Sequence, residues 1–237
     1  MSFRNLSRRL YQFSAGLSPL VLLALAVSAY RGAPSAPREL TLERLNIVDP
    51  DGRVRLVIAN RQRLPEPVLD GVRMAREDGS APGILFYNAE GDEAGGLVFD
   101  SDTTGGRRAA YGGLMFDRYK QDQTLGLVYQ EERGALTSGM QVWDRPNQSY
   151  LPTFRQVDSL RRLPPALRGQ AFAQLNASGA LGAQRVFVGR TPARASELRL
   201  SDARGRPRLL VTVDSLGQPS IVFLDAAGRI TQRIPTP

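Results

Sequence analysis

Two short polar segments hold the residue types that could do chemistry in this chain. The first, residues 87–97, places Asn88, Glu90, Asp92 and Glu93 within six residues and follows them with a glycine pair. Such a density of side-chain oxygens could hold a cation, or could supply the acid and the base of glycoside hydrolysis. The alternative is a solvated hairpin tip whose glycine pair forms a β-bulge.

The second segment, residues 116–124, joins two apolar runs and carries Tyr119 at its centre. Loops often carry function, and tyrosine offers contact area with a polar tip, so a recognition loop is one interpretation. A long hairpin loop with a packed tyrosine is the other. Together the two segments give the binding candidates, and no catalytic residue is assigned among them: Asn88, Glu90, Asp92, Glu93, Asp117, Tyr119, Gln121 and Asp122.

The chain contains no histidine and no cysteine, which excludes several classes of site. Serine or cysteine nucleophiles activated by histidine, zinc or haem sites with imidazole or thiolate ligands, and disulfides are all ruled out. We expect no cofactor, with calcium as the possible exception because it takes oxygen ligands.

An uncharged N-terminal run indicates export. Three arginines precede it, no charge occurs from Tyr11 to Tyr30, and residues 31–38 form a linker rich in proline and alanine. Residues 1–30 fit a signal anchor that spans as a transmembrane helix, and they also fit a cleaved signal peptide. Arginines on both sides leave the orientation open, although the short leading tail favours a cytoplasmic N-terminus. We expect an envelope protein that is membrane-anchored and periplasmic, or secreted after cleavage.

Residues 39–237 are expected to form a single all-β domain. A four-residue signature, Asp or Asn first and Gly fourth, begins at five places between short apolar runs: Asp49, Asn88, Asp202, Asp214 and Asp225. The first side chain can accept hydrogen bonds from the backbone of the turn, and glycine supplies a positive φ, so these are hairpin turns. Several strands are apolar at both parities, which favours an antiparallel meander closed into a sandwich or a barrel.

Residues 153–176 depart from the β pattern. Pro165 suits the first turn of a helix, and the residues after it fit one short amphipathic helix in a connector. The formal charge is +8, with arginines scattered singly instead of clustered, so we expect solvated strand faces and no nucleic-acid partner.

Long motifs in the polar segments carry a resemblance. The sequence of residues 45–60, the FYNxEGDExGGL run ending at Leu97 and the FDxYxQDQ run from Phe116 to Gln123 resemble a family of uncharacterised bacterial proteins with an N-terminal signal or anchor. The resemblance implies export and groups the two polar segments, but it implies no activity. We therefore expect a non-enzymatic binding or structural protein of the cell envelope with a glycan or protein partner. The alternatives are a carboxylate-based glycan hydrolase and a calcium-stabilised module.

Overall fold

The computed structural model describes residues 38–74, 81–106 and 108–235. The chain divides into two compact units, and the second, Leu42–Pro237, holds every strand and helix named below. The expected leader of residues 1–30 and nearly all of the linker lie outside the described residues. Within the described ranges, neither helix has both the length and the apolar character needed to cross a membrane.

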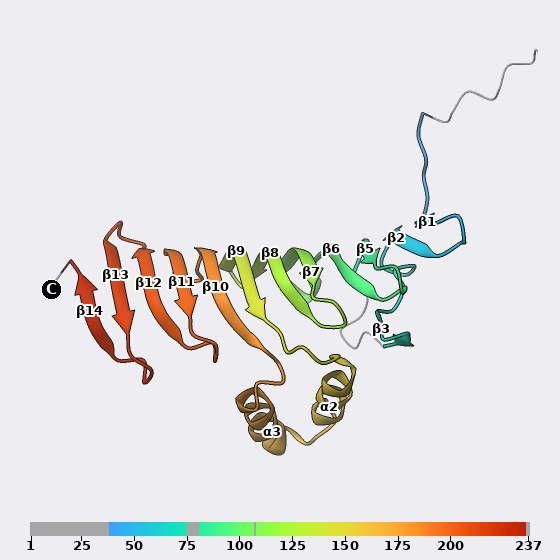
Figure 1. Cartoon of the computed structure of the whole chain (residues 1–237). Coiled ribbons are helices and arrows are strands. Elements are labelled where there is room, and N and C mark those ends of the chain that lie inside the picture. The colour runs from blue at the N-terminus through green and yellow to red at the C-terminus, as the bar shows by residue number, and fades with distance from the viewer. Residues whose placement is uncertain (1–37, 75–80, 107, 236–237) are drawn as a thin grey trace, which may run out of the picture. The chain divides into compact units, whose positions relative to one another are not determined.

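Twelve antiparallel strands form one sheet, in which each strand lies beside its neighbour in the chain (Figure 1). The sheet order is β1 (Arg44–Val48), β2 (Val54–Ala59), β5 (Gly83–Tyr87), β6 (Glu93–Asp102), β7 (Ala109–Asp117), β8 (Gln123–Glu132), β9 (Ala135–Asp144), β10 (Ala183–Arg190), β11 (Ser196–Ser201), β12 (Pro207–Val213), β13 (Pro219–Leu224) and β14 (Ile230–Ile234). A short 3₁₀ helix, η1 (Thr104–Gly106), lies between β6 and β7. The all-β prediction and the meander are confirmed.

All five hairpin turns predicted from the sequence are present. In the turn that begins at Asp214, Oδ1 of the aspartate accepts hydrogen bonds from the backbone N–H groups of Leu216 and Gln218, at 2.8 and 2.9 Å. Gly217 has a φ of 83° and its N–H bonds to the carbonyl oxygen of Asp214. The other four turns repeat the backbone bond and the positive φ, so local turn chemistry defines the hairpins.

Two insertions interrupt the meander. A small hairpin of β3 (Val68–Leu69) and β4 (Val72–Arg73) lies between β2 and β5, and its Asp70–Gly71 tip has positive φ at both residues. Helices α2 (Leu151–Arg161) and α3 (Pro165–Ala177) connect β9 to β10. The sequence predicted only the second helix. The first also forms, and it tolerates Pro152 because this residue lies in its first turn, where a missing N–H costs nothing.

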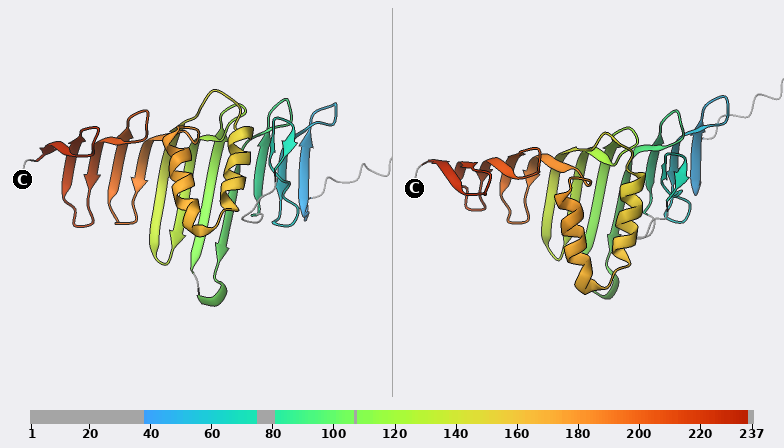
Figure 2. Two further views of the ribbon diagram at one scale, coloured as in Figure 1. Left: turned by 90° about the horizontal axis from the view of Figure 1, so that it is seen from below. Right: turned by 60° about the horizontal axis from the view of Figure 1, so that its bottom comes forward.

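The two faces of the sheet have different surroundings. Both helices lie on one side of the sheet, which we call the helical face (Figure 2). The strand residues among the buried apolar side chains point to this side, including Val57, Leu85, Phe187 and Val222. We call the other side the open face.

Closure into a sandwich or barrel, as expected from the sequence, is not found. The described residues form an open sheet with β1 and β14 at its two edges. In β5, residues 84–87 are apolar on both faces of the strand. Only the side chains of Leu85 and Tyr87, which share the helical face, are buried. The pattern correctly indicates two apolar faces, but the described part of this chain covers one of them.

Candidate functional site

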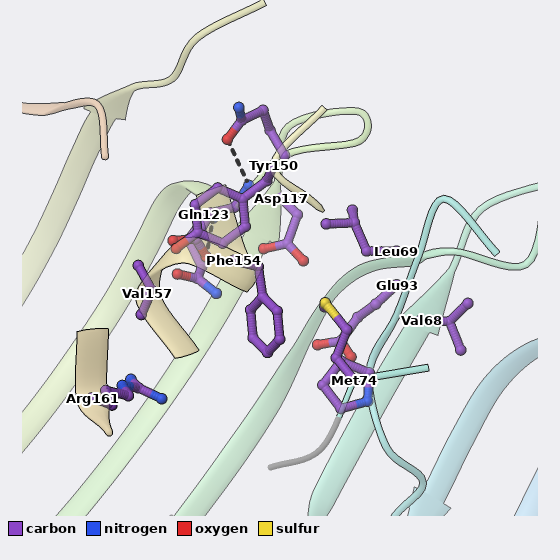
Figure 3. A pocket seen from close by; sticks show the side chains of 13 residues that line it. Val68, Leu69, Met74, Glu93, Asp117, Gln123, Tyr150, Phe154, Val157 and Arg161 are labelled. Atoms are coloured by element: carbon purple, nitrogen blue, oxygen red, sulfur yellow. Dashed lines mark hydrogen bonds between the residues drawn. The ribbon is translucent and has the colours of Figure 1, made fainter. Parts of the chain in front are cut away.

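A pocket of about 250 Å³ opens on the helical face, between α2, the β3–β4 hairpin and the ends of β6, β7 and β8 (Figure 3). Leu69 and Met74 form one wall, and Phe154 and Val157 of α2 form the other. Its polar lining comes from both sequence segments singled out above: Glu93, Asp117, Gln121, Asp122 and Gln123, together with Tyr150 and Arg161.

Asp117 is the most perturbed carboxyl group in this pocket. It ends β7 at a register shift against β8, and because Phe116 before it lies on the open face, ordinary alternation points the Asp117 side chain to the helical face. Burial raises its pKa to about 7, and the carboxylates of Glu93 and Asp122 add to the rise. Oδ1 of Asp117 is buried and has no hydrogen-bond partner within the described residues. Near neutral pH this group can therefore bind or release a proton, and one of its oxygens can still accept a hydrogen bond.

Arg145 supports the pocket from behind. Its side chain is only 9% exposed, and Nη2 lies 3.3 Å from Oδ2 of Asp122. Nε and Nη1 donate to the carbonyl oxygens of Gln123 and Leu181, at 2.6 and 2.7 Å. The guanidinium also lies 5.8 Å from the ring centre of Trp143, which is close enough for a cation–π contact. Asp122 is therefore held by a fixed positive charge, and the same charge only partly offsets the rise in the pKa of Asp117.

Gln121 fixes the loop after β7 against the start of α2. Its side chain is 4% exposed, and Nε2 donates to the carbonyl oxygen of Gln148 at 2.8 Å. In return, the N–H of Tyr150 donates to the carbonyl oxygen of Lys120 at 2.9 Å. This candidate residue therefore positions the pocket wall as well as lining it.

Glu90 and Tyr119 belong to a separate, solvent-exposed network that we call the surface network. The hydroxyl of Tyr119 donates to Glu90 Oε1 at 2.7 Å, while Lys120 Nζ lies 3.2 Å from Glu90 Oε2 and 2.7 Å from Asp70 Oδ1. Hydrogen bonds from Tyr119 and then Lys120 lower the pKa of Glu90, and the bond from Lys120 lowers that of Asp70. The network ties the β3–β4 hairpin to the loops after β5 and β7.

Asn88 and Asp92 have structural contacts. Oδ1 of Asn88 accepts from the backbone N–H groups of Glu90 and Asp92, as its turn signature predicts. Asp92 is 2% exposed, and its Oδ1 accepts from the N–H of Gly71 at 2.9 Å, which attaches the β3–β4 hairpin. The bulge expected from Gly95 and Gly96 lies one residue earlier: both glycines pair with β5, and the register shift leaves Ala94 without a partner in the ladder, with Gly95 at a φ of 127°.

The structure thus brings the two polar segments into contact but divides the candidates into three groups. Glu93, Asp117, Gln121 and Asp122 meet at the pocket, Glu90 and Tyr119 lie in the surface network, and Asn88 and Asp92 build turns. Sequence reasoning missed Asp70, Arg145, Tyr150 and Phe154. No local signal separates Arg145 from the other scattered arginines, although the Asp70–Gly71 dipeptide is a recognisable turn signal.

Among the described residues, no group of three or more acidic side chains has an arrangement that could hold a metal ion. No protein-family model matches the chain, and no curated protein is similar to it. The family resemblance of the motifs therefore stays a prediction, and functional arguments depend on the geometry.

Proposed function

We propose that this chain is a non-enzymatic binding protein of the bacterial cell envelope, held at the membrane by its N-terminal segment. The observation that supports binding most directly is Asp117, which lines the pocket and whose buried Oδ1 has no hydrogen-bond partner among the described residues. A buried acceptor without a partner costs free energy, on the order of 1 to 3 kcal/mol. Rotation of the carboxyl group would turn this oxygen towards a pocket ligand, and a hydrogen bond donated by that ligand would recover part of the cost.

The chemistry of the lining favours an amine or hydroxyl group attached to a small apolar body. Carboxyl groups of Glu93, Asp117 and Asp122 surround the polar end, and Arg145 balances Asp122 from behind. An ammonium group near Asp117 would stabilise its ionised form and lower its pKa. Leu69, Met74 and Phe154 offer the apolar contact. Amino sugars and amine-bearing peptide ends of envelope polymers have this combination of groups.

Calorimetric titration of the purified full chain in a mild detergent tests the proposal. The probes are glucosamine oligomers with free amino groups and the same oligomers after N-acetylation, which differ only in charge and in one donor group. We expect binding of the free amines, and a loss of at least about tenfold in affinity with Asp117→Asn, whose side chain keeps the shape but not the charge. Glu43→Gln, at an exposed position outside the pocket lining and distant from it in the sequence, is the matched control.

Failure of both oligomers to bind, or equal binding by wild type and Asp117→Asn, would contradict this use of the pocket. Release of a proton from Asp117 on binding gives a second readout. The measured heat should then depend on the ionisation enthalpy of the buffer near pH 7, because the pKa of Asp117 without ligand is about 7.

The raised pKa of Asp117 also supports a second candidate, a carboxylate-based glycan hydrolase. A protonated carboxyl at neutral pH can act as a general acid, and Asp122, held by Arg145, could act as the base or nucleophile. The pocket of about 250 Å³ is small for a site that must hold the sugars on both sides of a scissile bond, whereas a single terminal amino sugar needs less room, so binding remains the better proposal. Release of reducing ends from cell-wall glycan by wild type and not by Asp117→Asn would favour the hydrolase.

A further inference from the structure

The open face of the sheet carries an uninterrupted row of large apolar side chains across all twelve strands. Residues that pair directly between strands share a face, and each member of this row is paired with the next. The row is Leu45, Ile58, Ile84, Leu97, Leu114, Leu127, Met140, Val188, Leu198, Val211, Ile221 and Ile234. We call it the central row.

A second row runs beside it and is almost as apolar. It includes Ile47, Leu56, Phe116, Leu125 and Phe223, with Gly95 and Gln232 as exceptions. Over Gly95, the rings of Phe86 and Phe116 stack at 6.4 Å between centroids. No side chain of either row is buried in the described part of the chain.

Charge is almost absent from this face. Charged side chains of the described strands reach it only at strand ends or at the bulge in β10, as with Glu131, Asp144 and Arg190. Soluble monomers rarely expose contiguous apolar patches of more than a few hundred Å². Twelve strands about 4.8 Å apart, with three residues of each on the open face, present roughly 1,000 Å².

We propose that the open face is covered by the open face of a second copy of this chain, so that two sheets form a β-sandwich between protomers. The area supports this partner, because a stable interface needs only about 800 Å² from each side. Two such sheets would pack about 10 Å apart, with their apolar rows interdigitated as in a sandwich within one chain. The strands have apolar side chains on both faces, and in such a dimer both faces would be covered.

The placement of arginines argues against a membrane surface as the alternative partner. A face that lies on anionic lipid should carry basic residues around its own border. In this sheet the arginines of five strands point to the helical face instead: Arg44, Arg55, Arg199, Arg208 and Arg233. If the open face lay on a membrane, the charge of these arginines would point away from the bilayer. The open face of a second copy is itself uncharged, so it needs no basic residues around it.

The surface also has a protrusion and a hollow that suit a two-fold pair. Leu127, in the middle of the sheet, is 55% exposed, and Phe99 is 54% exposed. Beside them, Gly112 leaves a shallow hollow of about 390 Å³, bounded by Leu97, Leu127 and Tyr129. In an isologous pair a protrusion on each copy can enter the hollow of the other.

Cysteine cross-linking on intact cells that express the full chain tests the proposal, because the natural chain has no cysteine. β8 and β9 are the sixth and seventh of the twelve strands. If the two sheets overlap fully, the two-fold axis lies between them and passes over the middle of each sheet. It therefore passes close to β8 and β9, whether it is parallel or perpendicular to the strands. Leu127→Cys and Met140→Cys should therefore each give covalent dimers with a short bis-maleimide. Gln130→Cys, exposed on the helical face of the same strand as Leu127, is the matched control and should give none.

A second variant tests the fit without disturbing the monomer. A Cβ on Gly112 would meet no atom closer than 3.9 Å, so Gly112→Val should fold normally and fill the hollow. We expect it to lower the yield of Leu127→Cys dimers several-fold, while Thr137→Val on the helical face leaves the yield unchanged. Absence of dimers from both open-face cysteines would overturn the proposal. Equal yields on the two faces, or conjugates to another protein or to lipid instead, would overturn it as well. A pocket that failed to bind amines would leave these results unaffected.

Discussion

The hydroxyl of Tyr119 donates a 2.7 Å hydrogen bond to Oε1 of Glu90, from a position 29 residues further along the chain. This bond joins the loop after β7 to the loop after β5. Lys120 continues the link to Asp70 at the tip of the β3–β4 hairpin. Three loops are therefore connected at the surface, and two of them, the β3–β4 hairpin and the loop after β7, also contribute residues to the pocket.

This contact makes the phenol of Tyr119 sensitive to Glu90. The hydrogen bond to Glu90 is the largest of the effects that raise the pKa of Tyr119. In Glu90→Gln the negative charge beside the developing phenolate is removed, so we expect the Tyr119 pKa to fall towards the ordinary tyrosine value. A titration of ¹³Cζ-labelled tyrosine by NMR measures it.

Tyr129 supplies the control for this titration. Its hydroxyl donates to Glu131 at 3.0 Å, and that bond raises its pKa in the same way. Glu90→Gln should leave the Tyr129 pKa unchanged, and Glu131→Gln should change only that of Tyr129. A response of both tyrosines to either substitution would show that the two pairs are not the cause.

Asp117 should make the protein less stable as the pH rises. The unfolded carboxyl has a pKa near 3.9, whereas burial raises the folded value to about 7. Between these two values the folded state keeps a proton that the unfolded state has lost, so stability falls with rising pH. The full loss is present above about pH 7 and absent below about pH 4.

Asp117→Asn should therefore be more stable than wild type at pH 8, on the order of 1 to 4 kcal/mol, and should match it at pH 4. Urea unfolding at pH 4, 6 and 8 measures the difference. Glu66→Gln, at an exposed glutamate, should run parallel to wild type throughout. A pH-independent gain for Asp117→Asn would mean that packing, and not ionisation, explains it.

The strands and their turns could be predicted because their causes are local. Each signature such as Asp214 to Gly217 places a side-chain acceptor and a positive φ within four residues, and the structure uses both. Helix α2 was missed because its apolar residues, Phe154, Val157 and Leu160, occur only every third position in a polar segment. In the structure α2 packs against α3 and buries Val157, and neither feature is visible in the local sequence pattern.

The candidate site could be predicted only in part. Its residues come from different strands and loops, and the pairing register of those strands decides which of them lie together. The polar segments could be recognised by composition, but Asp117 and Arg145 differ from their neighbours only in where bulges and strand ends place them. The open sheet was missed for a related reason. Alternation of Ile84 and Leu85 indicates that both faces are apolar, but it carries no information about whether the second cover belongs to the same chain.

Lys120 should prefer glycine to alanine as a replacement. Its φ is 53°, in the left-handed region, where a side chain costs roughly 1 kcal/mol relative to glycine. Both Lys120→Gly and Lys120→Ala remove the ion pairs with Asp70 and Glu90, which are partly exposed and contribute little. We expect Lys120→Gly to be the more stable variant by about 1 kcal/mol in urea unfolding. The reverse order would indicate a different backbone conformation at this position.

The pairing of β9 with β10 should depend on Gly189. These strands are joined through the two helices, and their register places Gly189 opposite Gly139. A Cβ on Gly189 would lie 2.1 Å from the carbonyl oxygen of Ser138, which is a backbone atom that cannot move aside without breaking the ladder. We expect Gly189→Ala to destabilise the protein by about 2 kcal/mol or more.

Gly112→Ala is the comparison, because a Cβ on Gly112 has free space and the substitution also restricts the unfolded chain. It should be neutral or stabilising by up to about 1 kcal/mol. The two variants change the same residue type within the same sheet, so intrinsic strand preference cannot explain a difference between them. If Gly189→Ala were tolerated equally well, β9 and β10 could not pair in this register. The central row would then be interrupted between Met140 and Val188, and the single twelve-stranded sheet would be wrong at its middle.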